Sequence, residues 1–161
     1  MKNRFLIMLA FQLSLVSLWQ TLPTDSLKAF AQEAAEQTKQ YKVGQIWAYQ
    51  TRSEEPRSNL TVIQIDQFPK VGTVIHIAIN RVNIKSASAR DGYSHQIPHA
   101  PMSEAAMEKS TTELISEKGK VDAVSMEGYG HWKQAFEAGK AGIFNCPVAE
   151  VVKTVENSLK K

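Results

Sequence analysis

Three consecutive segments with alternating apolar residues constrain the fold of this chain more than any other feature. They cover residues 43–52, 60–68 and 75–79, and short charged or proline-containing turns separate them. A period of two residues is typical of a β-strand that buries one face. Strands joined by short turns pair as an antiparallel meander, so one apolar face of the sheet needs a cover.

The second half of the chain supplies helices that can provide this cover. Ser103 has the character of a helix N-cap, and apolar residues along one helical face follow it to about Lys118. An aromatic stripe predicts a second helix that ends before Gly139, where glycine suits a left-handed cap. A valine stripe after Pro147 predicts the last helix, because proline fits the start of a helix.

The remaining segments complete the expected architecture. Residues 86–102 are rich in Ser, Gly, Pro and His and are expected to form a long loop, while residues 141–145 could form a fourth strand. We therefore predict a single α+β domain over residues 41–161. It should contain a small antiparallel sheet of three to four strands, with two to three helices packed on one face.

Residues 1–31 have the composition of a secretory signal peptide. A short basic start precedes an apolar run over residues 5–19, and small residues lead to a cleavage position after Ala31. The run is shorter than the roughly 20 apolar residues that a membrane-spanning helix needs. We expect a cleaved leader, a flexible lead-in over residues 32–40, no stable membrane anchor and a periplasmic or secreted protein. An uncleaved anchor is the alternative.

The charges of the chain argue against a nucleic-acid partner. The formal net charge is +3, and the predicted leader contains three basic residues but only one acidic residue. The chain that remains after cleavage is therefore nearly neutral, with basic residues scattered among acidic ones. A surface for nucleic acid needs a basic patch or stripe, so the sequence excludes this class of function.

The single cysteine, Cys146, limits both the fold and the chemistry. An exported domain with one cysteine cannot rest on an internal disulfide. Free cysteine is among the most buried residue types, so we expect Cys146 to pack as a small apolar residue. Two alternatives remain open, which are an intermolecular disulfide and a nucleophile whose pKa is lowered at the start of the last helix.

The stretch from Arg90 to His99 concentrates residues that could bind a ligand. It contains Tyr93, His95 and His99 within a segment expected to be a loop. Two histidines four residues apart could share a metal on a helix, but Pro98 excludes an ordinary helix through the pair. We therefore expect no metal or cofactor here, and favour a surface loop that binds a partner.

An enzyme is disfavoured by the sequence. Cys146 could pair with His76 or His131 as a nucleophile and its base, and their distance in sequence neither supports nor excludes this. The chain contains no nucleophile elbow, phosphate-binding glycine loop or His-Glu-x-x-His motif. Glu54 and Glu55 are adjacent in a turn, where carboxylates are usually solvated.

The first predicted strand carries a second candidate binding surface. Trp47 and Tyr49 share one face of this strand, and Arg52 lies at its end. Since helices on one side cannot cover two apolar faces, a partner could cover the rest, and Trp, Tyr and Arg are typical of interfaces. The alternative is that Trp47 packs in the core beneath the aromatic helix.

The segment from Tyr41 to Arg52 reads Tyr-x-x-Gly-Gln-x-Trp-x-Tyr-x-Thr-Arg. This pattern resembles the opening of small uncharacterised bacterial proteins. The similarity extends through residues 99–103 and the segment from Trp132 to Phe144. The resemblance implies a shared small α+β fold and no established activity.

These features predict an exported, non-catalytic binding domain that recognises another protein in the bacterial envelope, such as an inhibitor or immunity protein. The candidate binding residues are Trp47, Tyr49, Arg52, Tyr93, His95 and His99. The alternative is a small periplasmic hydrolase or metal-binding protein that uses His95, His99, His131 or Cys146. A third interpretation is a structural envelope protein that associates with itself.

Overall fold

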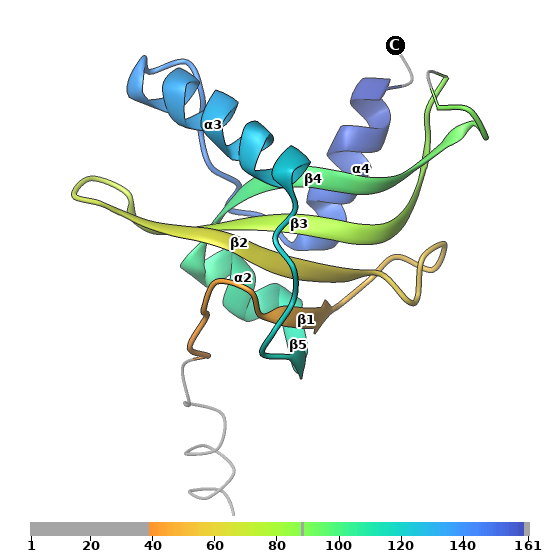
Figure 1. The fold of residues 1–161 in the computed structure, drawn as a ribbon, viewed down its shortest axis with the longest axis horizontal. Coiled ribbons are helices and arrows are strands. Elements are labelled where there is room, and N and C mark those ends of the chain that lie inside the picture. The colour runs from red at the N-terminus through yellow and green to blue at the C-terminus, as the bar shows by residue number, and fades with distance from the viewer. Residues whose placement is uncertain (1–38, 88, 160–161) are drawn as a thin grey trace, which may run out of the picture. The chain divides into compact units, whose positions relative to one another are not determined.

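Five antiparallel strands form one open sheet in the computed structural model, which describes residues 39–87 and 89–159. The strands lie in the order β4-β3-β2-β1-β5 (Figure 1). Their bounds are β1 Ile46–Tyr49, β2 Asn59–Phe68, β3 Gly72–Lys85, β4 Tyr93–Ser103 and β5 Thr111–Ser116. The helices are α2 Glu104–Ser110, α3 Ala123–Glu137 and α4 Val148–Leu159. The α+β class is confirmed, but the sheet has five strands rather than three to four.

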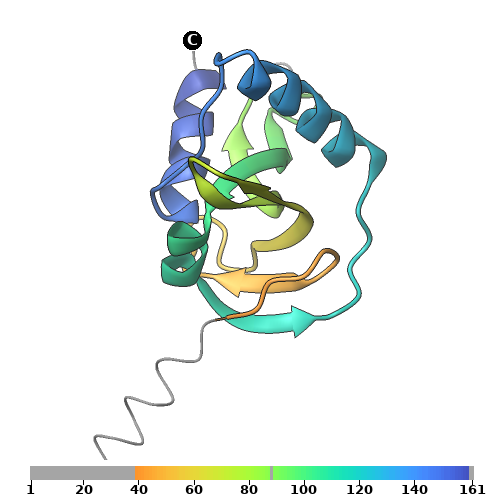
Figure 2. The ribbon, with the colours of Figure 1, turned by 90° about the vertical axis from the view of Figure 1, so that its left-hand side faces the viewer.

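Helices cover both faces of this sheet, not one as expected. On β3, Ile75 and Ile77 belong to a core that includes residues of α2 and α4. His76 alternates with them and contacts Tyr129 and Trp132 of α3, with ring centroids 4.9 and 4.6 Å away. Figure 2 shows α2 and α4 on one side of the curved sheet and α3 on the other. Side chains on both faces of the sheet are therefore packed against helices.

Strand β4 occupies most of the segment that was expected to be a loop. Residues 93–103 pair with β3 along one edge of the sheet. An edge strand tolerates Pro98 and Pro101 because one of its two sides makes no ladder hydrogen bonds. A β-bulge places Pro98 and His99 opposite the single residue Ala78. The loop prediction was wrong because prolines and polar residues hide the alternation of this strand.

The helix predicted from Ser103 to about Lys118 is instead a short helix followed by a strand. Ser103 is the N-cap, and its Oγ accepts a hydrogen bond from the Ala106 N–H at 3.3 Å. The helix ends at Ser110, and Thr111 is already extended at φ −74° and ψ 145°. The β-branched threonines favour a strand, which pairs with β1 at the other sheet edge.

The signals at the ends of the later helices act as predicted. Gly139 has a φ of +70°, and its N–H donates to the Phe136 carbonyl at 2.9 Å, which caps α3. The Pro147 carbonyl accepts from the Val151 N–H at 3.2 Å at the start of α4. The fourth strand expected over residues 141–145 is absent from the described chain, where an isolated parallel bridge joins Phe144 to β4.

The described chain begins at the end of the predicted lead-in. The Lys39 ammonium donates to the carbonyls of Glu108, at 3.0 Å, and Thr111. The predicted leader, residues 1–31, and residues 32–38 of the lead-in lie outside the described residues. Of the helices that the structure does describe, none combines the length and the apolar character needed to span a membrane.

Candidate functional site

Two loops meet at one end of the sheet, and we call this region the hairpin end. It consists of residues 50–58 between β1 and β2, and of residues 81–87 and 89–95 at the turn between β3 and β4 (Figure 1). A hollow of about 650 Å³ lies there, and its lining residues are Glu54, Glu55, Pro56, Arg57, Arg81, Val82, Asn83 and His95. A second hollow of about 280 Å³ is lined by Arg52, Glu54, Asn83, Lys85, Tyr93 and Glu156.

The two hollows share Glu54 and Asn83, so they adjoin. Three of the predicted binding residues line them, although the first is some forty positions from the others in the sequence. Arg52 and Tyr93 line the smaller hollow, and His95 lines the larger one. The fold therefore brings half of the predicted set to one place, because the β1–β2 loop and the β3–β4 hairpin end on the same side of the sheet.

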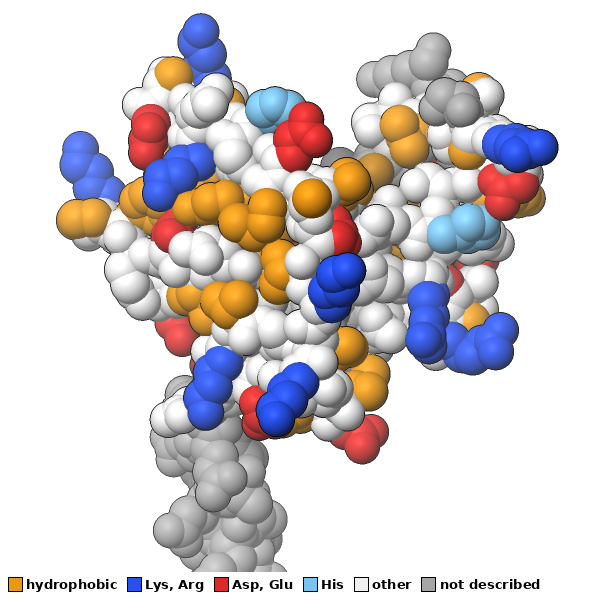
Figure 3. All heavy atoms as spheres, viewed as in Figure 1, with side chains coloured by type: hydrophobic (Ala, Val, Ile, Leu, Met, Phe, Trp, Pro, Cys, Tyr) orange, Lys and Arg blue, Asp and Glu red, His pale blue; other side chains and the backbone are white. Residues whose placement is uncertain are grey.

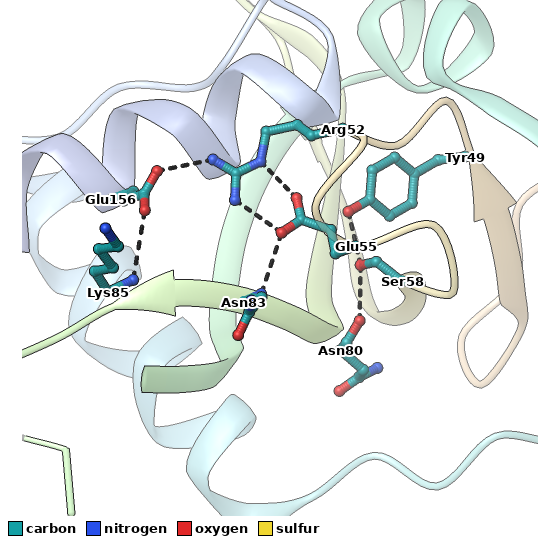
Figure 4. Close-up of polar contacts among 8 residues, drawn as sticks. All are labelled: Tyr49, Arg52, Glu55, Ser58, Asn80, Asn83, Lys85 and Glu156. Atoms are coloured by element: carbon teal, nitrogen blue, oxygen red, sulfur yellow. Dashed lines mark hydrogen bonds and ion pairs between the residues drawn. The ribbon is translucent and has the colours of Figure 1, made fainter. Parts of the chain in front are cut away.

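A network of charged hydrogen bonds fixes the wall of both hollows (Figure 4). Arg52 donates to both carboxylate oxygens of Glu55, at 2.6 and 2.7 Å, and to Glu156 of α4 at 3.0 Å. The same Glu55 carboxylate accepts from the Asn83 backbone N–H at 3.1 Å. Hydrogen bonding to Glu55 raises the pKa of Arg52 above its ordinary value. Arg52 therefore ties the β1–β2 loop to α4 and, through Glu55, to β3. Its positive charge is balanced by the carboxylates of Glu55 and Glu156.

Trp47 and Tyr49 lie in the core rather than on the surface of the hairpin end. They are 7 % and 4 % exposed and belong to the core on the α2 and α4 side of the sheet. Trp47 packs against Tyr41 at 5.3 Å between ring centroids, so it does not lie beneath the aromatic residues of α3. The Tyr49 hydroxyl shares a hydrogen bond of 2.7 Å with Ser58, and burial raises its pKa to about 12. A partner would not reach either ring in this structure.

His95 and Tyr93 do face solvent, and Asp91 organises both. Asp91 accepts from the Tyr93 N–H at 3.1 Å, and the His95 Nε2 lies 2.9 Å from its other oxygen. The His95 Nδ1 lies 3.2 Å from the Val82 carbonyl, so both ring nitrogens face acceptors. The hydrogen bond with Asp91 raises the pKa of His95, because a protonated ring can donate at both nitrogens. Tyr93 is 37 % exposed and can contact a partner.

Two exposed arginines, Arg57 and Arg81, line the larger hollow. Within residues 39–87 and 89–159, the side chains of Arg57 and Arg81 make no ion pair. Arg81 also has the one positive φ among the described non-glycine residues, at 57°, where the register of β3 shifts. Such backbone conformations cost about 1–3 kcal/mol and cluster at binding sites. Figure 3 shows Lys and Arg side chains beside a histidine at the right of the molecule.

His99 lies away from the hairpin end, in a second group that we call the histidine cluster: His76, His99, Asp66, Tyr129 and Lys133. The His99 Nε2 is 3.0 Å from the His76 Nδ1, and the other His76 nitrogen is 3.5 Å from Asp66. Tyr129 donates to Asp66 at 2.8 Å, and the Lys133 ammonium donates to Tyr129 at 3.1 Å. Within the described residues the His76 Nε2 makes no hydrogen bond, and the tautomers of the two rings set which one donates in the His76–His99 hydrogen bond.

Burial sets the protonation of this cluster. His76 is fully buried and His99 is half-buried, and desolvation lowers the pKa of each to about 4. Both rings are therefore neutral near pH 7, and they pack under Tyr129 and Trp132. The cluster attaches α3 to the sheet. Sequence analysis missed it because the pair forms only when β3 and β4 are neighbours, although a histidine within the isoleucine pattern of β3 was a signal.

A pair of glycine substitutions tests how closely α3 sits on this cluster. A Cβ at Gly128 would lie 2.9 Å from the Cβ of His99, whereas a Cβ at Gly130 meets nothing within 4 Å. We expect Gly130→Ala to stabilise the protein by about 0.5–1 kcal/mol, because alanine favours helix. Gly128→Ala should lose this gain and destabilise the protein. Urea denaturation of both variants measures the difference, and equal stabilisation by both would contradict this packing.

The residues proposed for catalysis or metal binding do not converge. Cys146 packs against the core on the α2 and α4 side, whereas His76 is on the opposite face of the sheet. His131 is exposed on α3, and His95 is at the hairpin end. Among the described residues there is no group of three or more His, Cys, Asp or Glu side chains that could hold a metal ion.

The fold and the site define an α+β domain whose two loops form a hollowed, partly cationic end. No protein-family model, curated protein or solved structure matches this chain. The resemblance of the segment from Tyr41 to Arg52 to small bacterial proteins stays a prediction. Trp47 and Tyr49 of this segment are core residues, Tyr41 packs against the core, and Arg52 belongs to the network that holds the β1–β2 loop.

Proposed function

We propose that this chain is an exported, non-catalytic binding domain that recognises another protein of the bacterial envelope through its hairpin end. The observation that supports this proposal is the gathering of Arg52, Tyr93 and His95 around two adjoining hollows. Arg52 holds the loop in place, while Tyr93 and His95 present exposed surface. Loops held on a rigid sheet are the usual place for binding residues.

The composition of the hairpin end suits a protein partner. Tyr and Arg are enriched where proteins bind each other, and Tyr93, Arg57 and Arg81 are exposed there. The internal network also limits the motion of the β1–β2 loop before binding, so less conformational entropy is lost when a partner binds. An inhibitor or immunity protein is a function of this kind.

Capture of a partner tests the proposal. The tagged chain is incubated with envelope extract beside Tyr93→Ala, His95→Ala and His131→Ala, each shown to be folded by circular dichroism. His131 is the control, because it is an exposed histidine on α3. We expect one stoichiometric partner, whose affinity falls at least about tenfold with the two hairpin variants but not with the control. A partner bound equally by all variants, or no partner, would contradict the proposal.

Export makes a separate prediction. Cells that express the chain should contain, in the periplasmic fraction or the medium, a form that begins at Gln32. Mass spectrometry of the purified protein measures this end directly. A chain that keeps Met1 and is found in the cytoplasmic fraction would contradict the proposal that its partner lies in the envelope.

A further inference from the structure

We infer that the larger hollow of the hairpin end binds carboxylate groups of an acidic segment in the partner protein. This inference rests on the proposed function and names the chemistry of the partner. It depends on three features of the hollow, which are its charge, its size and the fixed position of its walls.

The charges that line the hollow leave positive charge available to a ligand. Glu55 is 4 % exposed, and its carboxylate accepts hydrogen bonds from Arg52 and the Asn83 N–H. Arg57 and Arg81 are exposed and make no ion pair within the described residues, and the remaining acidic lining residue is Glu54. Two unpaired guanidinium groups thus oppose one carboxylate.

Guanidinium groups are well suited to bind the carboxylates of a protein partner. Each one presents parallel N–H donors that match the two oxygens of a carboxylate. The proposed ligand is a protein, and the anionic side chains of an unmodified protein segment are the carboxylates of Asp and Glu. The backbone of Arg81 is anchored, because Val82 beside it is buried.

The hollow has room for more than one side chain. Its volume of about 650 Å³ lies within the range of protein sites that take drug-sized small molecules. Its wall is held by the hydrogen bonds of Glu55 to Arg52 and Asn83. These bonds tie the loop that carries Arg57 to β3, the strand that carries Arg81. An Asp- or Glu-containing loop or tail of a partner fits this description.

A short acidic peptide provides the direct test. The probe is Gly-Asp-Glu-Glu-Asp-Gly, and its Asn and Gln counterpart is the neutral control, both titrated into the ¹⁵N-labelled chain and followed by NMR. We expect the acidic peptide to shift the amide signals of Glu54, Arg57, Arg81, Asn83 and His95 while the neutral peptide shifts none. Binding should weaken strongly as salt is raised. No shifts with the acidic peptide, or equal shifts with both, would overturn the inference.

Three arginine variants make the test specific. Arg57→Gln and Arg81→Asn each remove a guanidinium from the hollow, and asparagine tolerates the left-handed backbone of Arg81. Arg90→Gln removes the same charge from the hairpin but outside the lining. We expect affinity for the acidic peptide to fall about tenfold in the first two and to stay within about twofold in the third. An equal loss of affinity in all three variants would show that the peptide binds by general charge attraction, and would overturn the inference of a site in the larger hollow.

Two further measurements separate the possible failures. Inorganic phosphate that competes with the peptide better than acetate at equal concentration would point to a phosphate ligand and overturn the assignment to carboxylates. If the captured partner depends on Tyr93 and His95 but binds normally to Arg57→Gln and Arg81→Asn, this inference fails and the proposed function stands. If no partner depends on any of the four residues, both fail.

Discussion

Glu55→Ala is expected to lower the free energy of unfolding by about 3–5 kcal/mol. The substitution leaves the Arg52 guanidinium with Glu156 alone and leaves the Asn83 N–H without an acceptor, in a place where both Glu55 and Arg52 are largely shielded from water. Removing one member of a buried charged pair costs far more than the pair itself contributes. Urea denaturation at neutral pH measures the loss as a shift of the midpoint.

Glu54→Ala is the matched control, because the neighbouring glutamate is exposed. It should change the free energy of unfolding by less than about 0.5 kcal/mol. A double-mutant cycle adds a second check. Arg52→Gln should cost less in the Glu55→Ala background than in the unmodified chain, because the interaction is already lost. Equal midpoints for Glu54→Ala and Glu55→Ala would show that the network does not hold the loop.

Acidification is expected to destabilise the protein between about pH 6.5 and pH 4. Burial lowers the pKa of His76 and His99 to about 4 in the folded chain, whereas an unfolded histidine has a pKa of about 6.5. In this window the unfolded chain binds more protons, so stability falls as the pH falls. Each histidine should contribute about 1.4 kcal/mol per pH unit, which is large against the stability of a small domain.

The groups that face the two rings shift the pKa of His76 in both directions, and burial decides the sign. Asp66 favours a charged His76, and Lys133 opposes it, but burial is the largest effect on the pKa. His99 is affected by burial and then by a charged His76, so the second proton is harder to add than the first. Protonation of the pair places two cations under Tyr129 and should weaken the attachment of α3.

Single histidine variants separate this effect from general acid denaturation. His76→Gln and His99→Gln each replace one histidine by a side chain that does not titrate. Each variant should therefore show about half the pH dependence of stability over this window. His131→Gln is the control, because His131 is exposed on the same helix. Urea denaturation at several pH values measures the slopes. A flat profile for the unmodified chain, or an equal change in the control, would contradict neutral buried histidines.

Local patterns were sufficient to predict several elements. The period-2 segments at β2 and β3, the Ser103 cap, the end of α3 at Gly139 and the valine stripe of α4 are all confirmed. Each depends on residues within a few positions of one another, on side-chain periodicity or on a backbone conformation that one residue type favours. The sequence by itself therefore determined the α+β class and the order of most elements.

Only the tertiary structure decided the arrangement of the candidate site. β4 and β5 are strands because β3 and β1 lie beside them, and neither segment alternates clearly enough alone. Arg52 meets Glu156, which is 104 positions away, and His76 meets His99 across a bulge. Trp47 is a core residue because β1 lies between β2 and β5 in the sheet. Strand pairing and burial depend on neighbours that are distant in sequence, so no local pattern carries them.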